Sequence, residues 1–327
     1  MNQFLYVQPT KQKAALAAVA KERQAVFIAG GTNLLDLMKR GIMAPEKLVD
    51  ITKLPLKKIT HENGNLQIGA LALNSTIALH KTVLEKQPLL AQALQAGASG
   101  QLRNMATLGG NMLQRTRCPY FYDTALPCNK REPGSGCGAL VGFNRMHAIF
   151  GFSDKCIAVH PSDMSVALAA LDATVKVAGP QGERQISFTD LHRLPGDQPE
   201  RDTLLEKNEL ILGINIPDNS FAGNVHYLKV RDRASYAFAL VSVAAALATD
   251  NNIIKDVRLA MGGVAHKPWR LFAAEKYLVG KPISEATFRA AAEVAMQGAQ
   301  AFTHNAYKLK LAPNNVVEAL KSAAGIA

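Results

Sequence analysis

Two segments of the chain place a pair of glycines where an expected strand gives way to an expected helix. The first is Phe27–Arg40, which reads FIAGGTNLLDLMKR, and the second is Arg103–Arg115, which reads RNMATLGGNMLQR. Glycine lets the backbone come within hydrogen-bond distance of a phosphate, and successive amides form an anion-binding concavity. Each pair alone is equally well explained as a tight turn, but the two together favour phosphate binding. Neither segment is a G-x-G-x-x-G or Walker A motif, so an ordinary Rossmann or P-loop fold is not expected.

Hydrophobic runs and turns around these segments predict an α+β fold. A strand at 25–29, a helix at 34–40 and a strand at 47–52 form a small α/β layer. Strands and helices mix after residue 66, with a hairpin that turns at Gly179–Gly182 and a strand at Leu210–Pro217. Further strands at 225–231, 238–248 and 253–261 precede helices at 271–279, 284–300 and 313–324. We therefore expect three parts, at 1–55, 56–222 and 223–327.

The charge and hydropathy of the chain exclude several classes of protein. The net charge is +11, but the basic residues are spread along the whole chain and are not interleaved with aromatic residues. Nucleic-acid binding is therefore not expected. No run of 18 or more apolar residues is present, which excludes a membrane span, and the first residues lack the pattern of a signal peptide.

All four cysteines of the chain fall within one segment of irregular pattern. They are Cys118, Cys128, Cys137 and Cys156, with the spacing C-x9-C-x8-C-x18-C. Four cysteines are too few for a disulfide scaffold in a chain of this length, although two disulfides stay open. Nearby Arg and Lys favour thiolates, because positive charge lowers the pKa of a thiol. Four thiolates suit tetrahedral zinc or an iron–sulfur cluster, and the lack of a C-x2-4-C pair favours the cluster.

The glycine segments resemble the two diphosphate-binding loops in the flavin-binding subunit of molybdenum hydroxylases, the xanthine dehydrogenase family. The family loops look like A-G-G-T-[ND]-L and T-[LIV]-G-G-N, and the resemblance covers essentially the whole chain. It implies an FAD-binding fold of the PCMH type, with a small α/β subdomain and a mixed α+β subdomain, followed by a C-terminal antiparallel sheet with helices. The loop residues it implies at FAD are Phe27, Ile28, Ala29, Gly30, Gly31, Thr32, Asn33, Leu34, Thr107, Leu108, Gly109, Gly110 and Asn111.

Four residues outside the loops match family positions that contact FAD. By this resemblance, Asp163 contacts the adenosine part, and Ile211 makes an apolar contact with the flavin. Lys229 and the aromatic Tyr236 correspond to positions near the isoalloxazine ring. The chain departs from many relatives at Ser235, where they carry an acidic residue.

The cysteine segment, residues 112–160, resembles an insert found in a subset of the family. In that subset, which includes multi-subunit bacterial aldehyde oxidoreductases, the flavin subunit carries an additional [4Fe–4S] cluster. The resemblance implies that the four cysteines are its ligands. The charge of such a cluster would be offset by the basic residues of the segment, which are Arg115, Arg117, Lys130 and Arg131.

The resemblance implies an oxidoreductase subunit that transfers electrons and has no catalytic acid or base of its own. Its partners would be a large molybdenum-cofactor subunit and a small [2Fe–2S] subunit, in a heterotrimer that delivers electrons to an external acceptor. Without a signal of its own, the chain would be cytoplasmic or exported to the periplasm with a signal-bearing partner. A self-contained FAD oxidoreductase and a four-cysteine zinc-binding interaction module are the alternatives. His147, His160 and His266 are expected to be structural.

Overall fold

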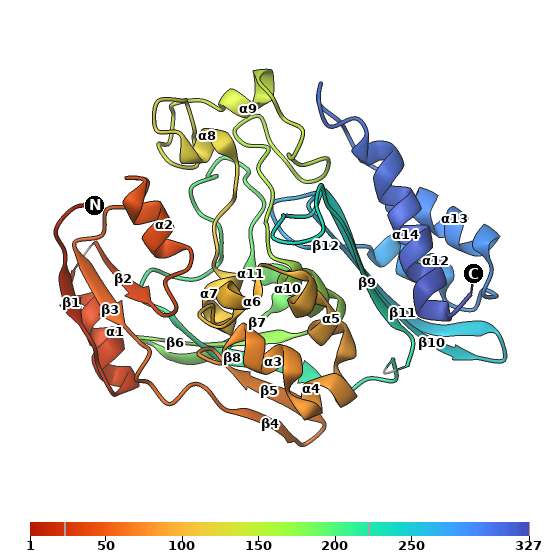
Figure 1. Cartoon of the computed structure of the whole chain (residues 1–327), viewed down its shortest axis with the longest axis horizontal. Coiled ribbons are helices and arrows are strands. Elements are labelled where there is room, and N and C mark those ends of the chain that lie inside the picture. The colour runs from red at the N-terminus through yellow and green to blue at the C-terminus, as the bar shows by residue number, and fades with distance from the viewer. Residues whose placement is uncertain (23, 222, 327) are drawn as a thin grey trace.

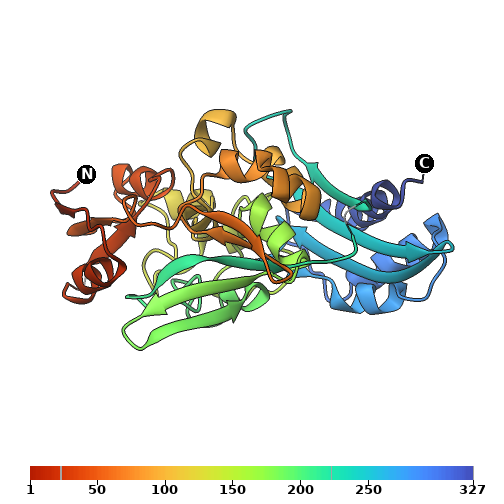
Figure 2. The same ribbon diagram turned by 90° about the horizontal axis from the view of Figure 1, so that it is seen from below.

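The computed structural model describes residues 1–22, 24–221 and 223–326. Its strands form three separate sheets, which Figure 1 shows in chain order from left to right. Figure 2 gives the same order from below. The mixture of sheets and helices confirms the expected α+β fold. The expected boundary at residue 222 and the last residue, 327, lie outside the described residues.

The N-terminal sheet is parallel and has the order β1-β3-β2. Its central strand β3 (Lys47–Asp50) carries the fully buried Val49, against which Ala15 and Val19 of helix α1 pack. The expected strand, helix and strand are all present, with ends that differ by one or two residues. The other elements of this part are β1 (Leu5–Val7), α1 (Gln12–Ala20), β2 (Ala25–Ile28) and α2 (Leu34–Lys39).

The central sheet is antiparallel and has the order β4-β5-β8-β6-β7. Its strands are β4 (Ile59–Glu62), β5 (Asn65–Gly69), β6 (Thr174–Gly179), β7 (Gly182–Ser187) and β8 (Leu210–Pro217). Gly179 pairs with Gly182 at the expected hairpin turn. Short helices accompany this sheet: α3 (Asn74–Leu79), α4 (Lys81–Lys86), α5 (Pro88–Ala96), α6 (Gly100–Arg103), α7 (Leu108–Met112), α10 (Asp163–Ala170) and α11 (Phe188–Leu191).

The cysteine segment stands above the central sheet at the top of Figure 1. Its only helices among the described residues are the single turns α8 (Pro119–Tyr122) and α9 (Gly138–Val141). Cys128 and Cys137 form an isolated antiparallel bridge, which brings two distant cysteines side by side.

The C-terminal sheet is antiparallel, in the order β12-β11-β10-β9, with three helices packed on it. The helix predicted at 284–300 ends at residue 295, because the chain turns at Gly298, where φ is +79°. The helix predicted from Pro313 begins five residues earlier and contains that proline. The elements are β9 (Val225–Val230), β10 (Val241–Asp250), β11 (Ile253–Gly262), β12 (Trp269–Arg270), α12 (Phe272–Leu278), α13 (Glu285–Ala295) and α14 (Lys308–Ala324).

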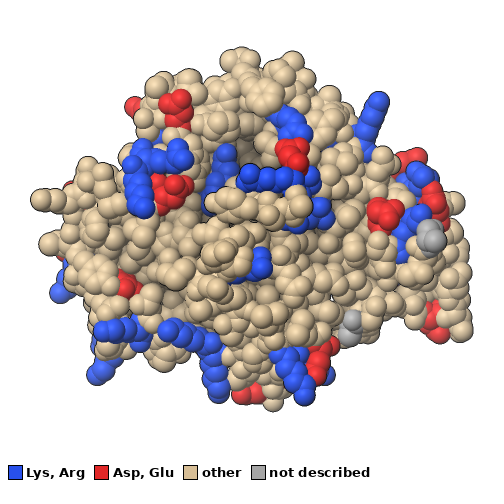
Figure 3. All heavy atoms as spheres, viewed as in Figure 1, with Lys and Arg blue, Asp and Glu red and all other residues tan. Residues whose placement is uncertain are grey.

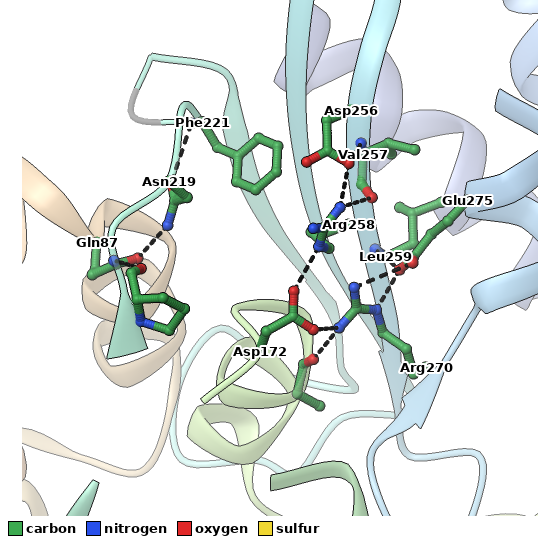
Figure 4. A network of polar contacts seen from close by, with 12 residues as sticks. Gln87, Asp172, Asn219, Phe221, Asp256, Val257, Arg258, Leu259, Arg270 and Glu275 are labelled. Atoms are coloured by element: carbon green, nitrogen blue, oxygen red, sulfur yellow. Dashed lines mark hydrogen bonds and ion pairs between the residues drawn. The ribbon is translucent and has the colours of Figure 1, made fainter. Parts of the chain in front are cut away.

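Ion pairs fix the C-terminal sheet to helix α10, which is buried along its whole length. Figure 4 shows Asp172, just beyond α10, accepting from Arg258 of β11 at 2.7 Å and from Arg270 of β12 at 2.8 Å. Arg270 also contacts Glu275 of α12. At the other end of α10, the carboxylate of Asp163 contacts Lys229 of β9, the first strand of the C-terminal sheet, at 2.8 Å.

Candidate functional site

The two glycine loops touch one another. A Cβ atom built on Gly30 would lie 1.9 Å from the carbonyl oxygen of Met105, in the turn that leads to the second loop. Gly31 has a φ of +71°, a conformation that favours glycine. In the second loop, a Cβ on Gly109 would lie 3.3 Å from Ala70. The glycines therefore allow two backbone segments far apart in sequence to form one surface.

A cleft with an empty volume of about 1000 Å³ runs along this surface. Gly110 donates its amide to the Thr107 hydroxyl at 3.3 Å, which fixes the turn into α7. Leu108 of the second loop does not line the cleft, because its side chain is fully buried in the central core. The expected residues that line this cleft are Phe27, Ile28, Ala29, Gly30, Gly31, Thr32, Asn33, Leu34, Thr107, Gly109, Gly110 and Ile211.

A second and wider cleft, with an empty volume of about 2150 Å³, continues from the first. The two share Thr32, Asn33 and Gly110 as lining residues. The remaining expected residues, Asn111, Asp163, Lys229 and Tyr236, all line the wider part. The structure thus brings every expected FAD residue except Leu108 to the walls of one continuous cleft.

Asn33 provides an unused donor in the wall of this cleft. Its Oδ1 accepts from the backbone amide of Arg115 at 2.9 Å, whereas its Nδ2 is buried without a hydrogen-bond partner. Leaving a buried donor unsatisfied costs about 1–3 kcal/mol, so the amide is suited to a ligand acceptor.

Positive charge exceeds negative charge in the wider cleft. It is lined by six basic and three acidic side chains, and Figure 3 shows Lys and Arg gathered around a hollow in this face. The acids Asp36, Asp163 and Asp232 each form an ion pair within the cleft. Three guanidinium groups hydrogen-bond only to neutral acceptors among the described residues: Arg103, Arg117 and Arg233. An anionic ligand such as a diphosphate would supply the missing counter-charge.

Asp163 and Lys229 form a buried ion pair of 2.8 Å, with 8% and 4% of their side chains exposed. The other carboxylate oxygen of Asp163 accepts from the Tyr227 hydroxyl at 2.8 Å. Burial and this carboxylate raise the pKa of Tyr227 well above its usual range. Because the two residues are joined, they meet a ligand at the same place. The geometry therefore does not support assigning Asp163 to the adenosine end and Lys229 to the isoalloxazine end of an extended FAD.

Tyr236 lies at the rim of the wider cleft with 57% of its surface exposed. Its φ is +52°, a conformation that is costly for a bulky residue. Arg233 donates to its backbone carbonyl and lies 5.5 Å from its ring centroid. This contact holds an exposed aromatic ring where it can cover a ligand in the cleft.

All four cysteines line one small cavity. All are free thiols, so the two disulfides left open by the sequence are absent. Burial raises the pKa of Cys118 to about 12. A hydrogen bond with the Cys156 thiol lowers the pKa of Cys137 to about 6, and the same bond raises that of Cys156. The expectation that nearby Arg and Lys lower the thiol pKa is therefore wrong for Cys118 and Cys156. Burial raises the pKa of both, and the hydrogen bond with Cys137 raises that of Cys156 further.

Most of the basic residues of the insert are engaged elsewhere. Arg115 and Lys130 both pair with Asp202, whereas Arg131 donates to the carbonyls of Tyr120 and Phe121. Arg117 lines the wider cleft, and Arg115 also lines the narrower one. Within the part of the chain that the structure describes, no group of three or more His, Cys, Asp or Glu is arranged to hold a single metal ion.

A third cavity separates the cleft from the cysteines. It has an empty volume of about 670 Å³ and is lined by Asp163, Arg117 and Phe238 from the cleft and by Cys118 and His147 from the insert. The sequence did not single out Phe238, and His147 was expected to be structural only. No sequence motif marks either residue. Arg117, in contrast, could be singled out from the sequence because it directly precedes Cys118.

Two family models together match most of the chain. Residues 2–219 match the family described as "FAD binding domain in molybdopterin dehydrogenase". Residues 226–323 match "CO dehydrogenase flavoprotein C-terminal domain". Over the residues that the structure describes, no helix is long and apolar enough to cross a membrane.

Individual relatives cover nearly the whole chain. The chain is 48% identical over 325 residues to the aldehyde oxidoreductase FAD-binding subunit PaoB of Escherichia coli (strain K12), with 99% of both chains covered. It is 27% identical to the glyceraldehyde dehydrogenase medium chain of Sulfolobus acidocaldarius, with 86% and 83% covered. Its structure resembles that of carbon monoxide dehydrogenase from Hydrogenophaga pseudoflava, with a TM-score of 0.78, 26% identity, and 99% and 98% covered. A binding module without flavin does not fit these matches.

Proposed function

Because the chain belongs to the FAD-binding subunits of the molybdenum hydroxylase family, we propose that it is the electron-transferring subunit of an aldehyde oxidoreductase. In this proposal it holds FAD and a [4Fe–4S] cluster and passes electrons to an external acceptor. The observation that carries the proposal is the continuous cleft on the two glycine loops together with an adjoining cavity that Cys118 shares with the four clustered thiols.

FAD would occupy the cleft. The backbone of Gly30, Gly31, Gly109 and Gly110, which lines the cleft, would contact the diphosphate, to which Asn33 offers its unused Nδ2. The other contacts proposed are the backbone of Leu108 and the remaining expected residues: Phe27, Ile28, Ala29, Thr32, Leu34, Thr107, Asn111, Asp163, Ile211, Lys229 and Tyr236. When bound, FAD supplies the redox chemistry, and the protein contributes binding, orientation and charge.

The cluster would be held by Cys118, Cys128, Cys137 and Cys156. Support comes from four free thiols around one cavity, because thiolate ligands from an irregular loop suit an iron–sulfur cluster. Such a cluster supplies one-electron transfer at a potential set by its surroundings.

The complex would contain a large molybdenum-cofactor subunit and a small [2Fe–2S] subunit, in which the large subunit selects the aldehyde. Family relatives include medium chains of carbon monoxide and glyceraldehyde dehydrogenases, whose names imply further chains. The compartment would be the periplasm, reached with a signal-bearing partner, or the cytoplasm. We also propose the subdomain bounds 1–55, 56–222 and 223–327, with the iron–sulfur insert at 112–160.

Replacement of one cysteine tests this assignment. The Cys128→Ser variant, purified with its partner subunits, should lose its iron and keep its FAD, because Cys128 lines the cysteine cavity but neither part of the cleft. Unchanged iron in this chain would contradict the ligand assignment. Aldehyde oxidation by the chain alone would instead support a self-contained oxidoreductase.

A further inference from the structure

The wall between the FAD cleft and the cysteine cavity contains a single cysteine. Cys118 lines the cavity that adjoins the wider cleft, and it also lines the cavity around the other three thiols. Cys128, Cys137 and Cys156 line only the latter among the cavities described here. Cys118 is thus the thiol that faces the proposed flavin site.

His147 lies against the sulfur of Cys118. Its Nε2 is 3.1 Å from Sγ, and 2% of the residue is exposed. A sulfur that ligates a cluster carries no proton and can only accept a hydrogen bond. A neutral imidazole carries one N–H, so a ring nitrogen this close to such a sulfur faces it as the donor.

The C-terminal part of the chain holds His147 in this position. The backbone carbonyl of His147 accepts from Lys308 Nζ at 2.9 Å and from Asn305 Nδ2 at 3.2 Å. Both donors are fully buried, and Lys308 has no acidic partner among the ion pairs of the described chain. These two buried donors fix the backbone at His147, so the contact of its ring with Cys118 does not depend on a flexible loop.

We infer that His147 donates a hydrogen bond from Nε2 to the sulfur of Cys118 and thereby raises the reduction potential of the bound cluster. The inference rests on the proposed function, since it needs the cluster to be present. Hydrogen bonds to ligand sulfur tune the potentials of iron–sulfur clusters. A donor favours the reduced state, because reduction adds negative charge to the sulfur ligands.

Substitution of His147 tests this inference through the potential of the cluster. His147→Phe removes the donor and keeps a ring, whereas His147→Gln retains an N–H group. The control is His304→Phe, since His304 is an exposed histidine next to Phe143 that does not contact a cysteine. The potential is measured on the purified complex by redox titration followed by electron paramagnetic resonance, with iron and FAD determined in each variant.

The His147→Phe variant should contain full iron and show a more negative cluster potential, while His147→Gln and His304→Phe stay close to wild type. A fully loaded His147→Phe variant with the wild-type potential would overturn the inference. If that variant loses iron, pulsed electron paramagnetic resonance on wild-type protein with 15N-labelled histidine tests the hydrogen bond to the cluster directly. A histidine coupling that disappears in His147→Gln supports the inference, and its absence from wild type overturns it. A wild-type chain without iron would instead refute the proposed function itself.

Discussion

The Cα of Gly30 faces the backbone carbonyl oxygen of Met105 so closely that a methyl group on Gly30 would lie 1.9 Å from that oxygen. This contact joins the first glycine loop, after β2, to the turn that begins the second, before α7. The two loops therefore form one ligand surface only while residue 30 lacks a side chain.

Gly30→Ala should weaken FAD binding and destabilise the protein by about 1–3 kcal/mol, because the added methyl group forces the two loops apart. The measurements are the ratio of FAD to protein after purification and the urea unfolding curve. Gly100→Ala is the matched control, since a Cβ there meets nothing within 4 Å and φ is unexceptional. Full FAD content in Gly30→Ala would contradict the proposed role of the loop contact.

Asp163→Asn should lower the free energy of unfolding by about 3–5 kcal/mol, because it leaves Lys229 buried without its counter-charge. Urea unfolding of the variant measures the loss. The exposed pair of Lys81 and Glu85 provides the comparison, where Glu85→Gln should cost less than about 1 kcal/mol. The double variant Asp163→Asn, Lys229→Met should recover part of the stability, and equal losses in the single and double variants would argue against the ion pair.

Acid should destabilise the protein partly through His192, whose pKa burial lowers to about 4. The unfolded chain takes up a proton near the usual histidine pKa of about 6.5, and the folded chain does so only near 4. Stability is therefore full above pH 6.5 and falls by about 3 kcal/mol as the pH drops to 4. Urea unfolding at several pH values should show a shallower decline for His192→Gln than for wild type or His304→Gln.

Arg117→Gln should weaken FAD binding about tenfold or more, because charged hydrogen bonds are worth about 1.5–3 kcal/mol. Arg117 lines the cleft and has no acidic partner among the ion pairs of the described residues. Arg145→Gln provides the control, since Arg145 lines the same cleft but is paired with Asp232 at 2.8 Å. FAD titration of the deflavinated proteins measures both effects, and an equal loss in both variants would contradict a special role for Arg117.

The strands and turns that surround the cleft could be predicted because local sequence determines them. The run Ala25–Ala29 ends at two glycines, and the Gly179–Gly182 hairpin has its own turn signal. Both are contiguous patterns that require no knowledge of the rest of the fold.

The contacts between distant segments could not be predicted in the same way. The ion pair of Asp163 and Lys229 joins residues 66 positions apart, and the resemblance alone assigned them to opposite ends of FAD. The raised pKa of Cys118 follows from burial, which nearby Arg and Lys in the sequence do not reveal. His147 carried no motif, because its contact with Cys118 depends on a backbone that Lys308 holds from more than 150 residues away.

The composition of the purified wild-type chain tests the account most directly. Absorbance spectra together with iron, acid-labile sulfide, zinc and flavin assays should give one FAD, four irons and four sulfides per chain, as the cleft and the four clustered thiols predict. A protein that binds FAD but holds zinc or no metal would contradict the cluster, and a colourless protein would contradict both sites.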